Sequence, residues 1–223
     1  MNSETSPKKV CVTGASGFIG THVVRVLLER GYHDHAAVRD ASNVAKVSHL
    51  HQLVPDAAER LTLFSADLNQ KGAFDEALHG CEGLFHVASP VKLTSPNPRE
   101  AIVDPAVNGT TSVLASAAKA ATVERIVFTS SIAAIMGFKK PDDYIFTEND
   151  WCEDADIHVH PYPLSKALAE RAAWQAVENW PGTHRPSLVS INPSYVFGPV
   201  YTKAHMQSSA EILRSRSEMA SAC

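Results

Sequence analysis

The chain has 223 residues, of which 44% are hydrophobic and 20% charged, which suits one folded α/β domain with a small appendage. Its net charge of −4 argues against nucleic acid and anionic membranes as main partners, and no apolar run is long enough to span a bilayer. The four cysteines are scattered without a C-x-x-C pair, and the polar N-terminus lacks a signal core. We therefore expect a cytoplasmic protein without a disulfide framework or a metal site.

Strand and helix patterns alternate along the chain. Strands are expected at residues 10–12, 35–38, 61–64, 83–88, 125–128 and 188–191. Helices are expected from residue 19 to Gly31 and at residues 42–53, 74–78, 101–121 and 162–179, whereas residues 90–98 and 136–160 are expected to be irregular. The alternation predicts a Rossmann-type α/β fold, a doubly wound parallel sheet of about six strands with helices on both faces.

Three glycines at a spacing of three lie between the first strand and the first helix: Gly14, Gly17 and Gly20. Strand, glycine turn and helix in this order are typical of a dinucleotide-binding fingerprint. Gly14 allows the tight turn, Gly17 allows the backbone to approach a pyrophosphate, and Gly20 allows close helix packing. The helix N-terminus offers N–H groups and a positive dipole end to the phosphates. The candidate cofactor-binding residues of this stretch are Gly14, Ser16, Gly17, Phe18, Ile19 and Gly20.

The residue after the second predicted strand indicates which dinucleotide is bound. Arg39 stands where a domain that binds NAD usually carries an acid for the ribose hydroxyls. A guanidinium there suits the additional phosphate of NADPH, and Lys46 lies close enough along the chain to assist. Asp40 leaves NAD(H) open as the less favoured alternative, because an acid beside Arg39 suits a ribose. We expect NADP(H) as the cofactor.

Tyr162 and Lys166 are four residues apart at the start of a predicted helix and therefore share one face of it. A neighbouring ammonium group favours the phenolate, lowers the pKa of a tyrosine and makes proton transfer near neutral pH easier. Ser131 follows the fifth predicted strand and is able to donate a hydrogen bond to a carbonyl oxygen that gains negative charge. The tyrosine–lysine spacing alone is common, and its value comes from the order of glycine turn, serine and tyrosine–lysine pair along the chain.

These motifs together resemble the extended short-chain dehydrogenase/reductase family, within the NAD-dependent epimerase/dehydratase superfamily. Residues 13–20 match its TGxxGxxG turn, Asp67-Leu68 its adenine-contacting pair, residues 86–89 its H-x-A-A segment and residues 107–110 its VNGT sequence. The chain is most similar to the branch of dihydroflavonol 4-reductases, cinnamoyl-CoA reductases and aldehyde reductases, through residues 37–40, 85–90, 128–131, 166–170 and 192–199.

The resemblance implies a catalytic triad of Ser131, Tyr162 and Lys166, with Ser130 as the alternative serine. Hydride would pass from NADPH to a ketone or aldehyde that Ser131 orients, and Tyr162 would protonate the new alkoxide. Lys166 would lower the pKa of Tyr162 and hold the nicotinamide ribose. The further cofactor-binding positions that the resemblance implies are Asp67, Leu68, Val87, Ala88, Ser89, Tyr162, Lys166, Pro193 and Val196. Asn108 is either a bridge to Lys166 or a polar helix residue, and His86 is expected to be a packed strand residue.

The chain is shorter than members of that family. We expect residues 1–199 to form the NAD(P)-binding domain and residues 200–223 to begin an incomplete substrate lobe, so that the sixth strand lies at an exposed edge of the sheet. A small-molecule carbonyl substrate is expected, while its identity and the oligomeric state are open. The alternatives are an NAD-dependent nucleotide-sugar epimerase or dehydratase, and a protein that binds NADPH without turnover or as an inactive partner of a longer paralogue.

Overall fold

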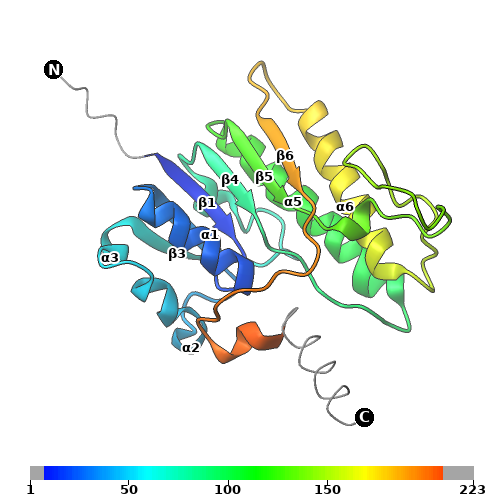
Figure 1. The fold of residues 1–223 in the computed structure, drawn as a ribbon. Coiled ribbons are helices and arrows are strands. Elements are labelled where there is room, and N and C mark those ends of the chain that lie inside the picture. The colour runs from blue at the N-terminus through cyan, green and yellow to red at the C-terminus, as the bar shows by residue number, and fades with distance from the viewer. Residues whose placement is uncertain (1–7, 208–223) are drawn as a thin grey trace, which may run out of the picture.

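A computed structural model of the chain describes residues 8–207 and contains one parallel sheet (Figure 1). Its strands are β1 Lys9–Thr13, β2 His33–Val38, β3 Leu61–Ser65, β4 Gly83–His86, β5 Arg125–Thr129 and β6 Ser187–Ile191. They are arranged in the order β3-β2-β1-β4-β5-β6, and every neighbouring pair is parallel. This order confirms the predicted Rossmann-type fold, and its topological switch point lies between β1 and β4.

Helices cover the two faces of the sheet. One layer consists of α1 Phe18–Glu29, α2 Val44–Val47, the 3₁₀ turn η1 Ser48–Gln52 and α3 Ala57–Arg60. The other layer consists of α4 Asp75–Leu78, α5 Asp104–Ala120 and α6 Pro161–Glu178 (Figure 1). Shorter turns are the π-helical η2 Arg99–Val103 and the 3₁₀ turns η3 Ile132–Ala134 and η4 Lys203–Gln207. No helix within residues 8–207 is long and apolar enough to cross a membrane.

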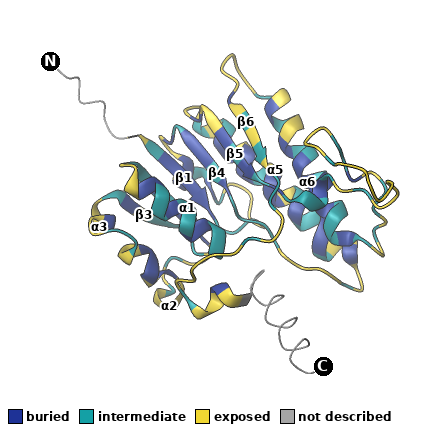
Figure 2. Cartoon of the chain, in the orientation of Figure 1, coloured by how far each residue is buried: buried dark blue, intermediate teal, exposed yellow. Residues whose placement is uncertain are grey.

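The two helical layers enclose two hydrophobic clusters, one on each face of the sheet (Figure 2). Successive residues of a strand point to opposite faces. In β1, Val10 and Val12 therefore belong to the cluster under α1, whereas Cys11 belongs to the cluster under α5 and α6. Burial on both faces explains why β1 is a continuous apolar run, which made it predictable from the sequence.

The helix expected at residues 42–53 is divided in the structure. The expected capping residue, Ser42, donates its hydroxyl hydrogen to Asp40 Oδ1 at 2.6 Å and caps no helix. The chain instead forms the short helix α2 and the turn η1, where the His49 ring bonds to the Thr21 hydroxyl at 3.1 Å. The short helix α3 was not predicted. Tertiary contacts with α1 therefore determine this region more than its own sequence does.

The helix expected at residues 101–121 begins with a π-helical turn. Pro105 lies in the first turn of α5, and it has no N–H with which to bond the carbonyl of the preceding turn. The chain accommodates this loss by widening to the π-helical geometry of Arg99–Val103. The fourth strand also ends two residues earlier than predicted, at His86 rather than at residue 88.

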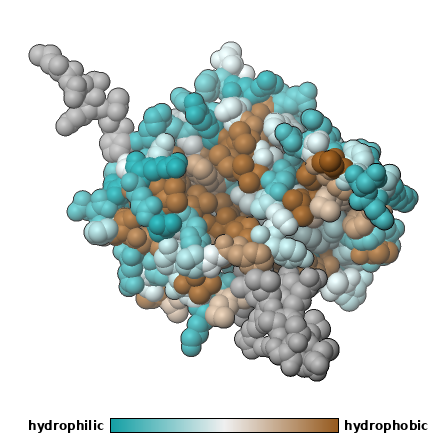
Figure 3. All heavy atoms as spheres, in the orientation of Figure 1, coloured by the Kyte–Doolittle hydropathy of each residue, from teal (hydrophilic) through white to brown (hydrophobic). Residues whose placement is uncertain are grey.

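Strand β6 lies at the edge of the sheet, as predicted. Its face toward the α1 side is open: Val189 is 52% exposed and Ile191 48% exposed. Leu188, which points the other way, packs against the cluster under α5 and α6. Figure 3 shows that apolar residues gather in the middle of the open face. The division into residues 1–199 and a lobe from residue 200 stays a prediction, since residues 208–223 lie outside the described part of the chain.

Candidate active site

The glycine turn lies at the carboxyl end of β1, beside the end of β4. Gly14 has φ +68°, and a Cβ there would lie 2.9 Å from the backbone nitrogen of Ala88. The Gly17 N–H donates to the Gly14 carbonyl at 2.9 Å and closes the turn. A Cβ on Gly20 would overlap this same carbonyl. Gly14 and Gly20 are therefore required by the close approach of backbone segments.

Replacing Gly20 with alanine is expected to destabilise the fold by about 3 kcal/mol or more, since the overlapping atom is backbone and is unable to move aside. The matched control is Gly198→Ala, where the nearest atoms to a new Cβ are side-chain atoms at 3.7 and 3.9 Å. Urea unfolding measures both changes. Equal stabilities for the two variants would contradict the packing argument.

A buried hydrogen-bond cluster fixes the segment that follows β4. The Thr13 hydroxyl oxygen accepts from the backbone nitrogens of Val87 and Ala88, both at 3.1 Å, and lies 2.7 Å from His86 Nδ1. A hydroxyl has one hydrogen, so it donates to Nδ1, and His86 carries its own proton on Nε2. Burial lowers the pKa of His86 to about 3, so the ring is neutral. His86 is thus packed in the strand as expected, and it orients the Thr13 hydroxyl that holds the chain at Val87 and Ala88.

The N-terminus of α1 is open to an anion. No side chain caps it, and its first turn contains no acidic residue. Unpaired N–H groups and the positive end of the helix dipole attract phosphate groups. The exposed Gly17 at the N-cap leaves room for a ligand against this helix end.

The charged residues after β2 and β3 lie side by side. Arg39 Nε is 4.0 Å from Asp67 Oδ2, and the Arg39 side chain is 85% exposed. Asp67 is held by its own turn, because its Oδ1 accepts from the backbone and side-chain nitrogens of Asn69 at 2.8 and 2.9 Å. Leu68 lies against Gly109 of α5, where a Cβ would come within 3.2 Å of the leucine side chain. The guanidinium is therefore available to a ligand at this edge.

The neighbouring acid, Asp40, is engaged in a local turn. Its Oδ1 accepts hydrogen bonds from the backbone nitrogen and the hydroxyl of Ser42, and these bonds lower the pKa of Asp40. Lys46 is exposed one turn further along. Arg39 and Lys46 are thus the exposed charged groups after β2 that take no part in the turn of Asp40. Two cations favour a phosphate group over a ribose hydroxyl as the ligand here.

The three predicted catalytic residues are brought together on the other side of the switch point. Ser131 caps η3, accepting from the backbone nitrogen of Ala133 at 3.2 Å, and its hydroxyl hydrogen-bonds to Tyr162. Tyr162 and Lys166 lie one turn apart on α6, with Lys166 Nζ 5.6 Å from the centre of the tyrosine ring. Lys166 Nζ donates to Ser89 Oγ at 2.9 Å and so joins α6 to the segment after β4.

The pKa of Tyr162 is shifted in the direction opposite to the expected one. Burial raises it, and the hydrogen bond with Ser131 offsets part of this rise. The ammonium group of Lys166 donates to Ser89 and is itself buried, which lowers the pKa of Lys166 to about 8. In this structure Tyr162 is therefore a neutral phenol with a proton to donate at neutral pH.

The two remaining polar candidates differ in their placement. Ser130 is buried, and its hydroxyl has no hydrogen-bond partner within residues 8–207, so Ser131 is the serine that faces Tyr162. Asn108 is exposed on α5, and no hydrogen bond in the described part of the chain joins it to Lys166. Its reading as a polar helix residue therefore fits the structure better than a bridging role.

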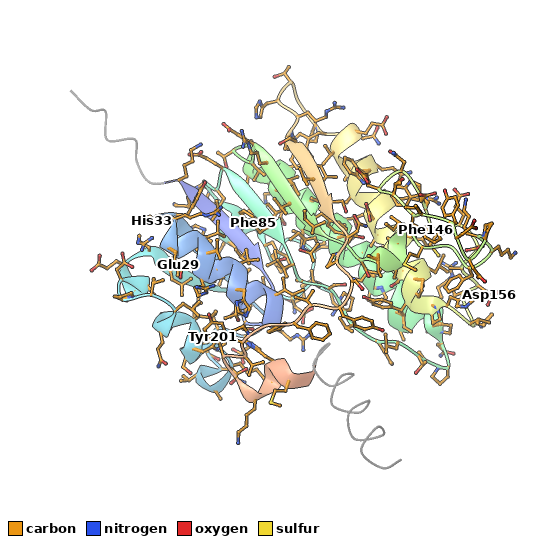
Figure 4. All side chains as sticks on the ribbon, in the orientation of Figure 1. Glu29, His33, Phe85, Phe146, Asp156 and Tyr201 are labelled. Carbon is orange, nitrogen blue, oxygen red and sulfur yellow. The ribbon has the colours of Figure 1, made fainter. Side chains whose placement is uncertain are left out.

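The segment after β6 runs from the catalytic residues to α1. Pro193 accepts from the backbone nitrogen of Ile132 at 3.0 Å, and Val196 lines a cavity of about 660 Å³ beside α1. Tyr201 (labelled in Figure 4) then packs edge-on against His22 of α1. His205 Nε2 lies 3.1 Å from the carbonyl oxygen of Ser16 in the glycine turn. These contacts were not predicted, because nothing local in residues 199–205 indicates a partner so distant in the chain.

The candidate site holds no metal-binding cluster: within residues 8–207, no group of three or more histidine, cysteine, aspartate or glutamate side chains is placed to hold an ion. A glycine turn at the switch point, beside a serine–tyrosine–lysine cluster, defines a Rossmann-fold protein of the short-chain dehydrogenase/reductase class.

Sequence comparison gives the family. Residues 11–223 match the model of the 3-beta hydroxysteroid dehydrogenase/isomerase family, and the chain belongs to that family. It is 44% identical to dihydroflavonol 4-reductase of Gerbera hybrida over 204 residues. These residues are 89% of this chain and 54% of the relative. It is 43% identical to cinnamoyl-CoA reductase CAD2 of Medicago truncatula over 220 residues, which are 96% of this chain and 65% of the relative. The predicted resemblance to the reductase branch is thereby confirmed.

Solved structures of reductases have a similar fold. Gre2 of Candida albicans in complex with NADPH superposes with a TM-score of 0.83 at 36% identity, over 94% of this chain and 65% of that one. Vestitone reductase of alfalfa (Medicago sativa) gives a TM-score of 0.72 at 32% identity, over 87% and 59%. The chain thus spans between about half and two thirds of the length of these relatives.

Proposed function

We propose that the chain binds NADPH and reduces the carbonyl group of a small ketone or aldehyde, with Tyr162 as the general acid. The observation that carries the proposal is the contact of Lys166 Nζ with Ser89 Oγ at 2.9 Å. It places the helix of Tyr162 against the strand end that adjoins the glycine turn. A proton donor and a nucleotide site thus share one edge of the sheet. The reductase names of the relatives and the NADPH bound to Gre2 support this reading.

The residues at the strand ends fit NADPH as a group. The uncapped N-terminus of α1 suits the pyrophosphate, and Arg39 with Lys46 suits the additional phosphate. Asp67 and Leu68 lie where the adenosine half would rest, beside Arg39. On the nicotinamide side, the proposed binding residues are Val87, Ala88, Ser89, Tyr162, Lys166, Pro193 and Val196.

The proposed chemistry divides among three side chains. When bound, NADPH would supply a hydride to the carbonyl carbon, and the carbonyl π-electron pair would pass to the oxygen. The Ser131 hydroxyl donates a hydrogen bond to that oxygen, and Tyr162 transfers its phenolic proton to it, so that the product is an alcohol. Lys166, largely protonated below its pKa of about 8, stabilises the phenolate that remains, and water returns the proton.

Replacing Arg39 with serine is expected to weaken NADPH binding by about 10- to 100-fold and to leave NADH binding within about twofold, because a charge-assisted bond to the additional phosphate is lost. Arg99→Ser is the control, since Arg99 is also exposed but pairs with Asp104 at 3.6 Å. Fluorescence titration with both nucleotides measures the change. Equal losses for NADH and NADPH would contradict the role of Arg39 and favour the epimerase alternative.

Turnover is tested with a panel of aldehydes and ketones, following the absorbance of NADPH as it is oxidised by the 223-residue chain. Consumption of NADPH that depends on one or more carbonyl compounds supports the proposal. Saturable NADPH binding without consumption across the panel would instead support the alternative of a protein that binds the nucleotide without turnover.

A further inference from the structure

A part-buried polar bridge joins α6 to the backbone of Ser131. Asn192 follows β6, and its Nδ2 donates to the Ser131 carbonyl at 3.1 Å and to Glu170 Oε2 at 2.9 Å. Both neighbours are acceptors, so the orientation of the amide follows from them. The two amide hydrogens are both used, one for each acceptor. Glu170, Asn192 and Ser131 therefore form a continuous chain of hydrogen bonds.

Glu170 is an unexpected residue at its position. It is 5% exposed, and no ion pair within residues 8–207 includes it. Burial of a carboxylate is costly unless hydrogen bonds compensate for it. Its partners are the amide of Asn192 and, at 3.4 Å, the indole nitrogen of Trp174. Packing does not call for an acid here, because buried alanines such as Ala169 and Ala173 fill the same helix.

The Ser131 carbonyl accepts two hydrogen bonds, one from the backbone of η3 and one from the side chain of Asn192. Beyond the end of β5, the Ser130 N–H donates to the Ile191 carbonyl at 2.8 Å, and the Ile132 N–H donates to the Pro193 carbonyl at 3.0 Å. Neither bond uses the Ser131 carbonyl, which accepts from the backbone nitrogen of Ala134 at 2.9 Å. The side chain of Asn192 adds a second donor to this carbonyl at 3.1 Å, and that bond is the one that leads on to Glu170 of α6.

We propose that Asn192 and Glu170 are positioning residues, which hold Ser131 against Tyr162 for carbonyl reduction; this inference rests on the proposed function. Helix α6 reaches Ser131 twice, through the Tyr162 hydroxyl and through Glu170 and Asn192. Tyr162, Lys166 and Glu170 are four residues apart and share one helix face. One helix, α6, therefore fixes both the hydroxyl and the backbone carbonyl of Ser131.

The test uses Asn192→Ala, which removes both bonds, and Glu170→Ala, which removes the support of Asn192. Each is expected to lower kcat by about 10- to 100-fold, as misplacement of a catalytic group does, with the KM for NADPH within about twofold. Glu170→Gln retains an oxygen for Asn192 and loses only the 3.4 Å bond from Trp174, because the new amide N–H groups and the indole N–H are all donors; since Trp174 is exposed, the variant is expected to stay within about threefold of wild type. Glu178→Gln, an exposed acid on the same helix, is the control.

A second readout does not depend on turnover. The hydrogen bond with Ser131 lowers the pKa of Tyr162, so displacement of Ser131 should move the ionisation of Tyr162 to higher pH. NMR of ¹³Cζ-labelled tyrosine follows this ionisation, and Tyr162→Phe assigns its signal among the five tyrosines. A shift in Asn192→Ala that is absent in Glu170→Gln supports the positioning role even if the wild type shows no carbonyl reduction. Unchanged Tyr162 ionisation in Asn192→Ala, with or without lower melting temperature, would overturn it.

Discussion

Replacing Tyr162 with phenylalanine is expected to lower kcat for carbonyl reduction by about 10²- to 10⁴-fold, the range that a positioned general acid contributes. The phenol is the group whose geometry suits this step, since it is bonded to Ser131 and lies one helical turn before Lys166. Burial raises its pKa, so the hydroxyl is protonated at neutral pH and is lost entirely in the variant. The ring that packs in the site is retained.

The Kd of the variant for NADPH should stay within about threefold of wild type, because the glycine turn and Arg39 are unchanged. A lower kcat with unchanged nucleotide binding indicates that a transition-state contact was lost. Tyr32→Phe is the control, since Tyr32 precedes β2 at the amino end of the strands, away from the carboxyl ends where the candidate site lies. Steady-state kinetics with a reactive carbonyl compound measures the effect. Retention of more than a tenth of wild-type kcat in Tyr162→Phe would contradict the assignment of the acid.

Replacing Asp34 with asparagine is expected to stabilise the protein, by about 4 kcal/mol at pH 7. Asp34 lies in the middle of the sheet, between Val10 of β1 and Leu61 of β3, and is 0% exposed. Neither carboxyl oxygen has a hydrogen-bond partner within residues 8–207. Burial raises the pKa of this carboxyl group from 3.8 to about 8, so it is protonated in the fold at neutral pH.

The effect of Asp34 depends on pH in a defined direction. Below about pH 4 the group is protonated in the folded and unfolded chains, and it does not affect stability. Between about pH 4 and pH 8 the unfolded chain releases this proton and the folded chain keeps it, so stability falls as pH rises. Asparagine has the shape of the neutral acid and releases no proton, so its advantage should grow by about 1.4 kcal/mol per pH unit between pH 5 and pH 7.

Urea unfolding of wild type and Asp34→Asn at pH 5, 6 and 7 measures this growth. Asp143→Asn is the control, because Asp143 is fully on the surface of the 136–160 excursion. A constant difference in the free energy of unfolding between Asp34→Asn and wild type over this pH range would show that Asp34 is not protonated in the fold.

The predictable parts of this molecule were those encoded within a few residues. The strands were predicted because each is a short apolar run, and the glycine turn because its spacing follows directly from the backbone contacts of Gly14 and Gly20. The division of residues 42–53 was not predictable, because it depends on where Ser42 and His49 find partners in the folded chain. Helix propensity is a weak guide where tertiary contacts decide.

The candidate site was predictable in its members more than in its connections. Ser131, Tyr162 and Lys166 lie together in the fold, but burial raises the pKa of Tyr162 instead of lowering it, and Lys166 donates to Ser89. The bridge from Glu170 to Asn192 spans 22 residues of sequence and depends on how α6 is rotated against the ends of β5 and β6. No local pattern carries that information.

Titration of the purified 223-residue chain with NADPH and NADH, followed by intrinsic fluorescence and by thermal unfolding, tests nucleotide binding directly. We expect saturable NADPH binding that is tighter than NADH binding. We also expect a stabilisation that approaches about 2.7 kcal/mol when the nucleotide reaches about 100 times its Kd. A well-folded chain that binds neither nucleotide, or that binds NADH more tightly than NADPH, would contradict the proposed NADPH site.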